Sequence, residues 1–304
     1  MMAKMMAKKS RAARYGPTLL AMALGVAALA YGHLGRDVQA QAPKRDVVKR
    51  LRLYVFELGN IPVSEGRMFD PPLKVDPTGC CIIVGHLIVH PKGTLIWDTG
   101  VVPDALIGSK TPGAQMYTGK PFRAKLAEIG YRPEDITYLG LSHYHFDHTA
   151  NANLFQNSTW IVQETERNAM FAGTKLPGGS QPDPSHYSAL KTSKAIVLAN
   201  TDEYDVFGDG TVVIKSAPGH TAGHQVLILS LPKTGRVMLA GDLYHFREER
   251  AQQVLPANLE YDKEQSRASR VKIEDYIKKN NIPMWLDHDS RLYATLKKAP
   301  NYIE

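Results

Sequence analysis

Four side chains that can bind a metal ion fall within six consecutive residues, directly after a short apolar segment. This segment has the composition of a buried strand, and the sequence HYHFDH at 143–148 follows it. Because alternate side chains of an extended chain point the same way, His143 and His145 can converge on one ion. Asp147 and His148 then reach a neighbouring point, and imidazole and carboxylate ligands suit Zn²⁺ while leaving a position for water. The sequence therefore predicts a metal site at the end of a strand.

Three further candidate ligands occur later in the chain, each after a segment with the composition of a strand. They are His220 in PGHTAGH (218–224), Asp242 directly after Gly241, and His288 between two aspartates. Loops that follow strands gather at an edge of a sheet, so residues far apart in the sequence can meet there. We therefore expect these residues to complete the site begun by the HYHFDH segment.

The remaining histidines fall into two groups. His224 and His245 adjoin the candidate ligands, and the sequence leaves their role open. The others match no ligand pattern, and we expect them in the leader, at the surface or in the core: His33, His86, His90 and His186.

Two series of predicted strands alternate with helices. Branched and aromatic runs bounded by Gly, Pro and Asp predict strands at Leu51–Leu58, Cys81–His90, Thr94–Asp98, Ile136–Leu141, Ala195–Leu198, Thr211–Ser216, Gln225–Leu231, Arg236–Ala240 and Pro283–Leu286. Amphipathic segments predict helices at Pro121–Ile129, Glu164–Phe171 and Glu260–Lys279. This order predicts a layered α/β protein whose core lies between two sheets, formed by one domain over residues 43–304.

The positive charge of the chain is concentrated at its start. The net charge is +7, and residues 1–42 contribute five of these seven units. Most of their basic residues precede an uncharged apolar run, Thr18–Tyr31, and small residues follow around Ala40. This order is typical of a secretory signal peptide, and the run is shorter than the roughly 20 residues that cross a bilayer. We expect residues 1–42 to direct export to the periplasm or the medium, with an uncleaved membrane anchor as the alternative.

The rest of the chain carries a net charge near +2 and gives no electrostatic case for binding nucleic acid. Its two cysteines, Cys80 and Cys81, are adjacent. Neighbouring side chains on a strand point to opposite faces, and zinc sites normally use spaced cysteines. We therefore expect two small apolar strand residues rather than a disulfide framework or a metal site.

The order of the motifs resembles the metallo-β-lactamase superfamily. The matching elements are His-x-His-x-Asp-His, Gly-His-Thr-x-Gly-His, Gly-Asp and a late histidine, preceded by WDTG at 97–100. The resemblance runs over residues 50–290 and implies a four-layer αββα sandwich, with two metal ions in a cleft at one edge of the sheets.

The resemblance also assigns the candidate ligands to two divalent ions, for which zinc is the first expectation. The first ion would be held by His143, His145 and His220. The second ion would be held by Asp147, His148 and His288, and Asp242 would bridge the two. Asp98 would either orient a ligand imidazole or begin a turn, and the sequence leaves both open.

Within the superfamily, the sequence most resembles the N-acyl-homoserine lactone lactonases. The supporting segments are LYVFELG at 53–59 and GDLYHF at 241–246. Lactonases of this kind often place a catalytic tyrosine three residues after the bridging aspartate. Here that position is His245, and the tyrosine is Tyr244. This difference leaves open which of the two residues, if either, contacts the substrate carbonyl.

The implied reaction is hydrolysis of a small-molecule lactone or ester, which for an N-acyl-homoserine lactone inactivates a quorum-sensing signal. A hydroxide bridging the metals would attack the lactone carbonyl, and Tyr244 or His245 would stabilise the oxyanion. Asp147 or Asp242 would handle the proton for the leaving ring oxygen. A homodimer is compatible with the sequence. An apolar slot for the acyl chain has these candidate residues: Met68, Phe69, Met116, Tyr117 and Phe146.

Other functions compete for the same motifs. A promiscuous exported ester or organophosphate hydrolase would keep the site and change the substrate. A true β-lactamase is disfavoured, because the β-lactamases of the superfamily lack a bridging aspartate like Asp242. Glyoxalase-type thioesterases keep that bridge but act mainly in the cytosol, which fits the leader poorly. A non-catalytic binding protein would usually have lost ligands, and all seven are present here.

Overall fold

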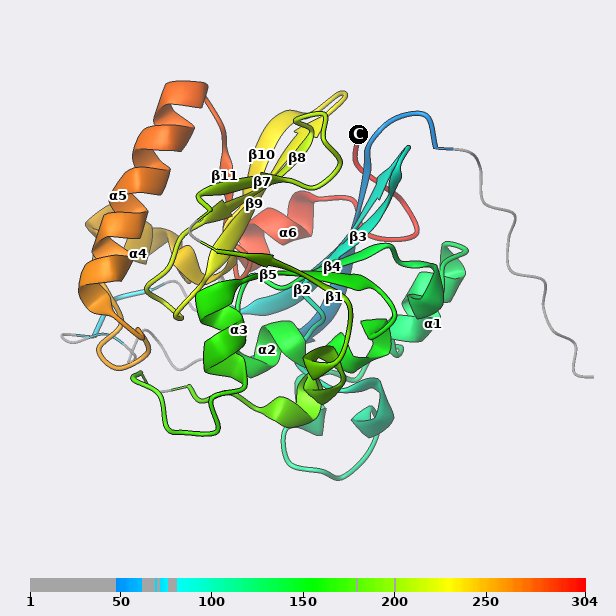
Figure 1. Ribbon diagram of the computed structural model, residues 1–304, viewed down its shortest axis with the longest axis horizontal. Coiled ribbons are helices and arrows are strands. Elements are labelled where there is room, and N and C mark those ends of the chain that lie inside the picture. The colour runs from blue at the N-terminus through cyan, green and yellow to red at the C-terminus, as the bar shows by residue number, and fades with distance from the viewer. Residues whose placement is uncertain (1–47, 62–68, 70–71, 76–80, 179, 200) are drawn as a thin grey trace, which may run out of the picture. The chain divides into compact units, whose positions relative to one another are not determined.

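The computed structural model describes residues 48–304, except for 62–68, 70–71, 76–80, 179 and 200. Two sheets lie against each other, and helices cover their outer faces (Figure 1). The first sheet contains, in spatial order, β1 (Arg52–Asn60), β2 (Ile82–His90), β3 (Gly93–Trp97), β4 (Tyr138–Gly140), β5 (Thr159–Gln163) and β6 (Ala195–Leu198). Strands β1 to β3 pair antiparallel, and β3 to β6 pair parallel.

The second sheet is mostly antiparallel. Its spatial order is β11 (Met284–Trp285), β10 (Gly235–Leu239), β9 (Gln225–Leu231), β8 (Val212–Ser216) and β7 (Glu203–Asp205). Only the β10–β11 pair among these is parallel. Because β8, β10 and β11 are each followed by a loop at the same end of this sheet, three segments that carry candidate ligands start close together.

The α-helices are short, apart from α5. They are α1 (Phe122–Glu128), α2 (Phe146–Thr149), α3 (Glu164–Met170), α4 (Arg247–Gln252), α5 (Lys263–Asn280) and α6 (Ser290–Thr295). The Asp262 carboxylate accepts hydrogen bonds from the backbone N–H groups of Glu264 and Gln265, which fixes the start of α5. The helix ends at Asn281 in the left-handed conformation, with φ of 51°.

Three apolar clusters produce the layered arrangement. Between the sheets, residues such as Val55, Leu95 and Trp97 pack against Leu227 and Leu239. The outer face of the first sheet is buried against α1 and α3, and the outer face of the second is buried against α5. The predicted αββα sandwich is therefore confirmed, because each sheet buries apolar side chains on both faces.

The predicted strands and helices are present, with ends that shift by up to three residues. The helix expected from Glu260 begins at Lys263, which leaves Glu260 free to turn inwards. Strands β5 and β7 and helices α4 and α6 were not predicted. The short α4 and α6 lack a long apolar period, and β7 has only three residues, so their local signals are weak.

The expectation for the cysteines is wrong for Cys81, which is disulfide-bonded. Side chains alternate in this way only within a strand, and Cys81 precedes β2 and is not part of it. It is buried beside Phe69, Leu73 and Phe246. Cys80 lies outside the described residues.

The leader predicted at residues 1–42 also lies outside the described residues, so its role in export stays a prediction. Among the residues that the structure describes, no helix is both long and apolar enough to span a bilayer.

Candidate metal centre

Each candidate ligand follows the end of a strand. His143 comes three residues after β4, His220 follows β8, Asp242 follows β10, and His288 follows β11. Gln225 at the start of β9 joins the two sheets here, because its backbone N–H donates to Ser142 O and its side chain donates to Leu141 O, both at 2.9 Å. The loops from both sheets therefore meet at one edge.

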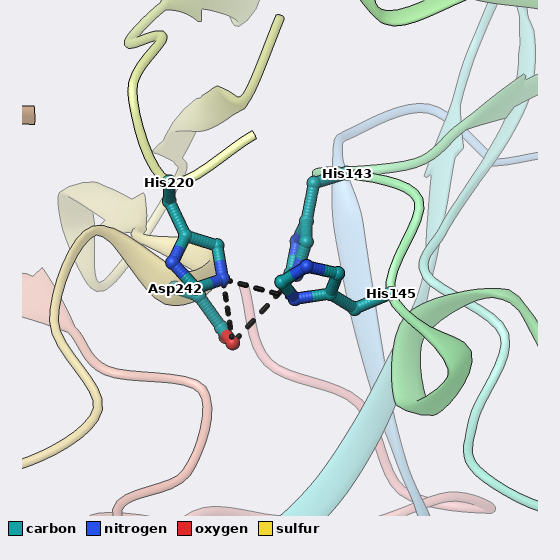
Figure 2. Close-up of side chains that lie close together, drawn as sticks. All are labelled: His143, His145, His220 and Asp242. Atoms are coloured by element: carbon teal, nitrogen blue, oxygen red, sulfur yellow. Dashed lines mark hydrogen bonds and ion pairs between the residues drawn. The ribbon is translucent and has the colours of Figure 1, made fainter. Parts of the chain in front are cut away.

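The first cluster contains His143, His145, His220 and Asp242 (Figure 2). All four side chains are buried, and their potential ligand atoms lie within 4.8 Å of one another. Nε2 of His220 lies 3.0 Å from Nδ1 of His145, and Nε2 of His143 lies 3.7 Å from Oδ2 of Asp242. Three imidazoles and a carboxylate that converge in this way can bind a divalent metal ion.

The second cluster shares Asp242 with the first. It contains Asp147, His148, His288 and Asp242, all buried and again within 4.8 Å of one another. Oδ1 of Asp242 lies 3.1 Å from Nε2 of His148 and 2.9 Å from Nε2 of His288. Because Asp242 turns Oδ2 to one cluster and Oδ1 to the other, its carboxylate can bridge two ions.

The imidazole nitrogens and carboxylate oxygens of the two clusters suit divalent metal ions. Among the described residues, Nε2 of His143, Nε2 of His148 and Oδ1 of Asp242 are buried without a hydrogen-bond partner. Unpaired buried polar atoms are costly, and two bound ions, one in each cluster, would satisfy all three. Burial and neighbouring histidines hold the pKa of both His143 and His145 well below the ordinary value. Neutral imidazole is the form that binds metal.

Comparison with known proteins agrees with this geometry. Residues 78–276 match the family described as the metallo-beta-lactamase superfamily. The chain belongs to this superfamily. Together with the two ligand clusters, this membership makes the protein a metal-dependent hydrolase.

Similar curated proteins are N-acyl homoserine lactonases. AttM of Agrobacterium fabrum is 30% identical over 267 residues, covering 83% of this chain and 98% of AttM. AttM of Azorhizobium caulinodans is 27% identical over 269 residues, covering 84% of this chain and 99% of AttM. A Bacillus thuringiensis AiiA mutant, solved with N-decanoyl-L-homoserine at its active site, shares the fold. Its TM-score is 0.68 at 22% identity, covering 84% of this chain and 100% of AiiA.

Buried carboxylates hold the ligand loops of the hydrolase from behind. Nδ1 of His148 faces Asp98, and Nδ1 of His220 lies 3.2 Å from Oε1 of Glu260. Glu166 joins two loops, because it accepts hydrogen bonds from the backbone N–H of Tyr144 and of Gly223 at 2.8 and 2.7 Å. Carboxylates that accept from ligand imidazoles fix the ring orientation and strengthen metal binding.

Two glycines are required by close packing in the ligand loops. Gly219 precedes His220 and has φ of +132°, and a Cβ there would lie 2.2 Å from the backbone N of Ser266 in α5. Gly241 precedes Asp242 and has φ of +51°. Larger residues would push both ligands out of place, so the Gly-His and Gly-Asp pairs are structural requirements of the site.

The structure separates Tyr244 from His245. Tyr244 is extended, with φ of −148° and ψ of 139°, so neighbouring side chains point to opposite sides. The Tyr244 ring lies in the core under Arg270, and its hydroxyl donates to Oε1 of Gln253. The tyrosine is therefore away from the cavity described below.

His245 faces the ligands. Its Nε2 lies 3.4 Å from Oδ2 of Asp242, and its Nδ1 lies 3.2 Å from Oε2 of Glu249, which is fully buried and paired with Arg270. Although burial opposes the charged form, the carboxylates of Glu249 and Asp242 raise the pKa of His245 well above its ordinary value.

A cavity of about 160 Å³ opens onto both clusters. Its polar wall is formed by His145, Asp147, Asp242, His245 and His288. Its apolar wall is formed by Ile61, Phe146, Phe246 and Leu259. The site therefore combines two candidate metal positions with a slot for an apolar group.

The residues expected to form an acyl slot lie in different parts of the structure. Phe146 lines the cavity and is partly exposed, whereas Phe69 packs behind it against Phe246, with ring centroids 6.0 Å apart. Met116 and Tyr117 line a second surface cavity that shares Ile61 and Cys81 with the first. Met68 lies outside the described residues.

Three supporting carboxylates were not predicted from the sequence: Glu166, Glu249 and Glu260. Glu166 contacts residues 22 to 57 positions away, and Glu260 contacts His220 from 40 positions away. No local spacing predicts such pairs. Of the three, only Glu249 could have been found from local spacing. It comes four residues after His245 in GDLYHFREE, and that spacing brings two side chains together on a helical turn.

Proposed function

We propose that this hydrolase opens the lactone ring of N-acyl homoserine lactones with the help of two divalent ions, zinc being the first candidate. The main support is the pair of ligand clusters that share Asp242 beside an apolar-walled cavity. The similarity to AttM, which is named an N-acyl homoserine lactonase, supports this substrate over other esters.

When bound, two divalent ions would polarise the lactone carbonyl and lower the pKa of a nearby water to about 7. The first ion would be held by His143, His145, His220 and Asp242, and the second by Asp147, His148, His288 and Asp242. His245 presents Nε2 to the cavity, and Glu249 accepts from Nδ1 and favours the charged ring. We assign His245, and not Tyr244, as the donor to the carbonyl oxygen as charge develops there.

Asp147 lines the same cavity and lies on the side of the second cluster. We assign it the transfer of a proton from the attacking water to the ring oxygen as that oxygen leaves, which completes ring opening. The apolar wall of Phe146, Phe246 and Leu259 would exclude water from the acyl chain. The product would be the ring-opened N-acyl homoserine.

The deciding measurement is kcat/KM of the purified metal-loaded protein on a panel of substrates. The panel contains N-acyl homoserine lactones of several acyl lengths, a β-lactam and a phosphotriester. We expect a lactone to be the best substrate. A preference for the phosphotriester of more than about tenfold, equal to 1.4 kcal/mol of transition-state stabilisation, would instead favour the ester or organophosphate hydrolase.

We also propose that the enzyme is exported through its N-terminal leader. The basic residues, the apolar run Thr18–Tyr31 and the small residues around Ala40 support this. N-terminal sequencing of protein recovered from the periplasm or medium should begin near residue 41 or 43. Protein that begins at Met1 would show that the leader is not cleaved.

A further inference from the structure

His224 lies behind Asp242 rather than in the cavity and is completely buried. It is the second histidine of the PGHTAGH segment, and it belongs to neither ligand cluster in the described part of the chain. Its ring centroid is nevertheless only 5.3 Å from that of His143 and 5.9 Å from that of His220. A buried imidazole must satisfy both ring nitrogens, so their partners decide its role.

Both nitrogens of His224 have partners on the backbone. Nδ1 lies 3.1 Å from the carbonyl oxygen of Ala217, and Nε2 lies 3.0 Å from the backbone nitrogen of Asp242. A carbonyl only accepts, so Nδ1 carries the hydrogen. An N–H only donates, so Nε2 has the free lone pair and accepts from Asp242. These two partners fix one neutral tautomer.

The backbone before Asp242 lies close against this ring. Gly241 has φ of +51°, and a Cβ added there would lie 2.7 Å from Nε2 of His224 and 2.8 Å from Cβ of Ser142. Asp242 follows with φ of −99° and ψ of 29°, values that are not helical. Its N–H is therefore held against the imidazole while its carboxylate projects between the two ligand clusters.

We propose that His224 is a positioning residue for the metal centre: by accepting the backbone N–H of Asp242, it holds the shared carboxylate where both ions can bind. It does not bind metal itself. The proposal depends on the metal centre and not on the choice of substrate. Because Asp242 belongs to both clusters, loss of this hydrogen bond should weaken both sites together.

Two substitutions separate the hydrogen bonds of His224. In His224→Gln, the amide oxygen can take the place of Nε2 and accept from Asp242. In His224→Asn, the shorter amide can take the place of Nδ1 and donate to Ala217, but it leaves Asp242 without an acceptor. His90→Asn is the matched control, because His90 is also buried but bonds to Asp209 outside the metal centre.

The measurement is metal affinity of the full-length protein, by competition with a chromophoric chelator, together with the Co²⁺ spectrum. We expect His224→Asn to weaken binding at both sites about tenfold to hundredfold. His224→Gln should stay close to wild type, and His90→Asn should be unchanged. Urea unfolding of the metal-free proteins separates folding from affinity. Equal affinity in folded Asn and Gln variants, or in the Asn variant and wild type, would overturn the proposal.

A second readout needs no variant. The ¹⁵N spectrum of the histidine side chains in the metal-loaded protein should show His224 as the neutral tautomer with hydrogen on Nδ1. The other tautomer, or a metal-bound His224, would contradict the proposal even if every variant failed to fold.

Discussion

Nδ1 of His148 donates a hydrogen bond to Oδ2 of Asp98 at 2.9 Å, and both side chains are buried. Oδ1 of Asp98 also accepts from the backbone N–H of Ser142 at 2.7 Å. Asp98 itself follows β3 with φ of 59°, an uncommon conformation that turns the carboxylate towards the ligand loop. Of the two roles left open by the sequence, the contacts favour orientation of the His148 imidazole.

Asp98→Asn should weaken metal binding at the second site about tenfold to hundredfold, because a neutral amide is a poorer acceptor for the imidazole N–H. The affinity of each site can be measured by competition with a chelator. Asp209→Asn is the control, since Asp209 also bonds to a histidine, His90, but away from the ligands. Unchanged affinity in Asp98→Asn would mean that Asp98 does not support the metal.

Glu166→Gln should destabilise the protein by about 1–3 kcal/mol, because its amide keeps only one oxygen and its NH₂ leaves the backbone N–H of either Tyr144 or Gly223 without an acceptor. Urea unfolding of the metal-loaded protein measures this change. Glu164→Gln on the same helix is the control, since Glu164 is exposed. An equal and small effect for both variants would argue against a role for Glu166 in joining the loops.

His245→Ala should lower kcat on lactones about hundredfold while the metal content stays near two ions, because it removes the donor to the carbonyl oxygen. Tyr244→Phe should change kcat much less, since the hydroxyl bonds to Gln253 outside the cavity. Steady-state kinetics and metal analysis test both. The reverse order of effects would return the catalytic role to Tyr244.

His86 should make folding sensitive to acid. Burial lowers its pKa from 6.5 to about 3, so below pH 6.5 the unfolded chain binds a proton that the folded protein does not. Stability should therefore fall as pH decreases, by about 2 kcal/mol at pH 5 at 1.36 kcal/mol per unit. Urea unfolding of wild type and His86→Gln at pH 7 and pH 5 tests this. An equal loss in both proteins would exclude His86 as the cause.

Removal of metal with a strong chelator should abolish lactone hydrolysis, and added Zn²⁺ should restore it, because the carbonyl and the attacking water both depend on the ions. Turnover and metal content are measured on the same samples. Full activity in metal-free protein would contradict the proposed mechanism.

The seven candidate ligands were accessible from the sequence because their signals are local. HYHFDH places four donors within six residues, and His220, Asp242 and His288 each follow a strand-like run. Two series of strands with helices between them predicted a layered α/β protein with its core between two sheets, and the family resemblance implied the αββα order. The family resemblance then gave the grouping of these ligands.

The carboxylates that support the ligand loops could be identified only from the packing of the two sheets. That packing brings Glu166 to the backbone N–H of Tyr144 and Gly223, and Glu260 to His220, across separations that no periodicity encodes. It also separates Tyr244 from His245, since an extended backbone sends the Tyr244 side chain into the core and the His245 side chain into the cavity. Residue type and spacing thus determined which atoms can bind metal, whereas tertiary contacts determined how those atoms are held, because hydrogen bonds between distant loops form only after the sheets pack.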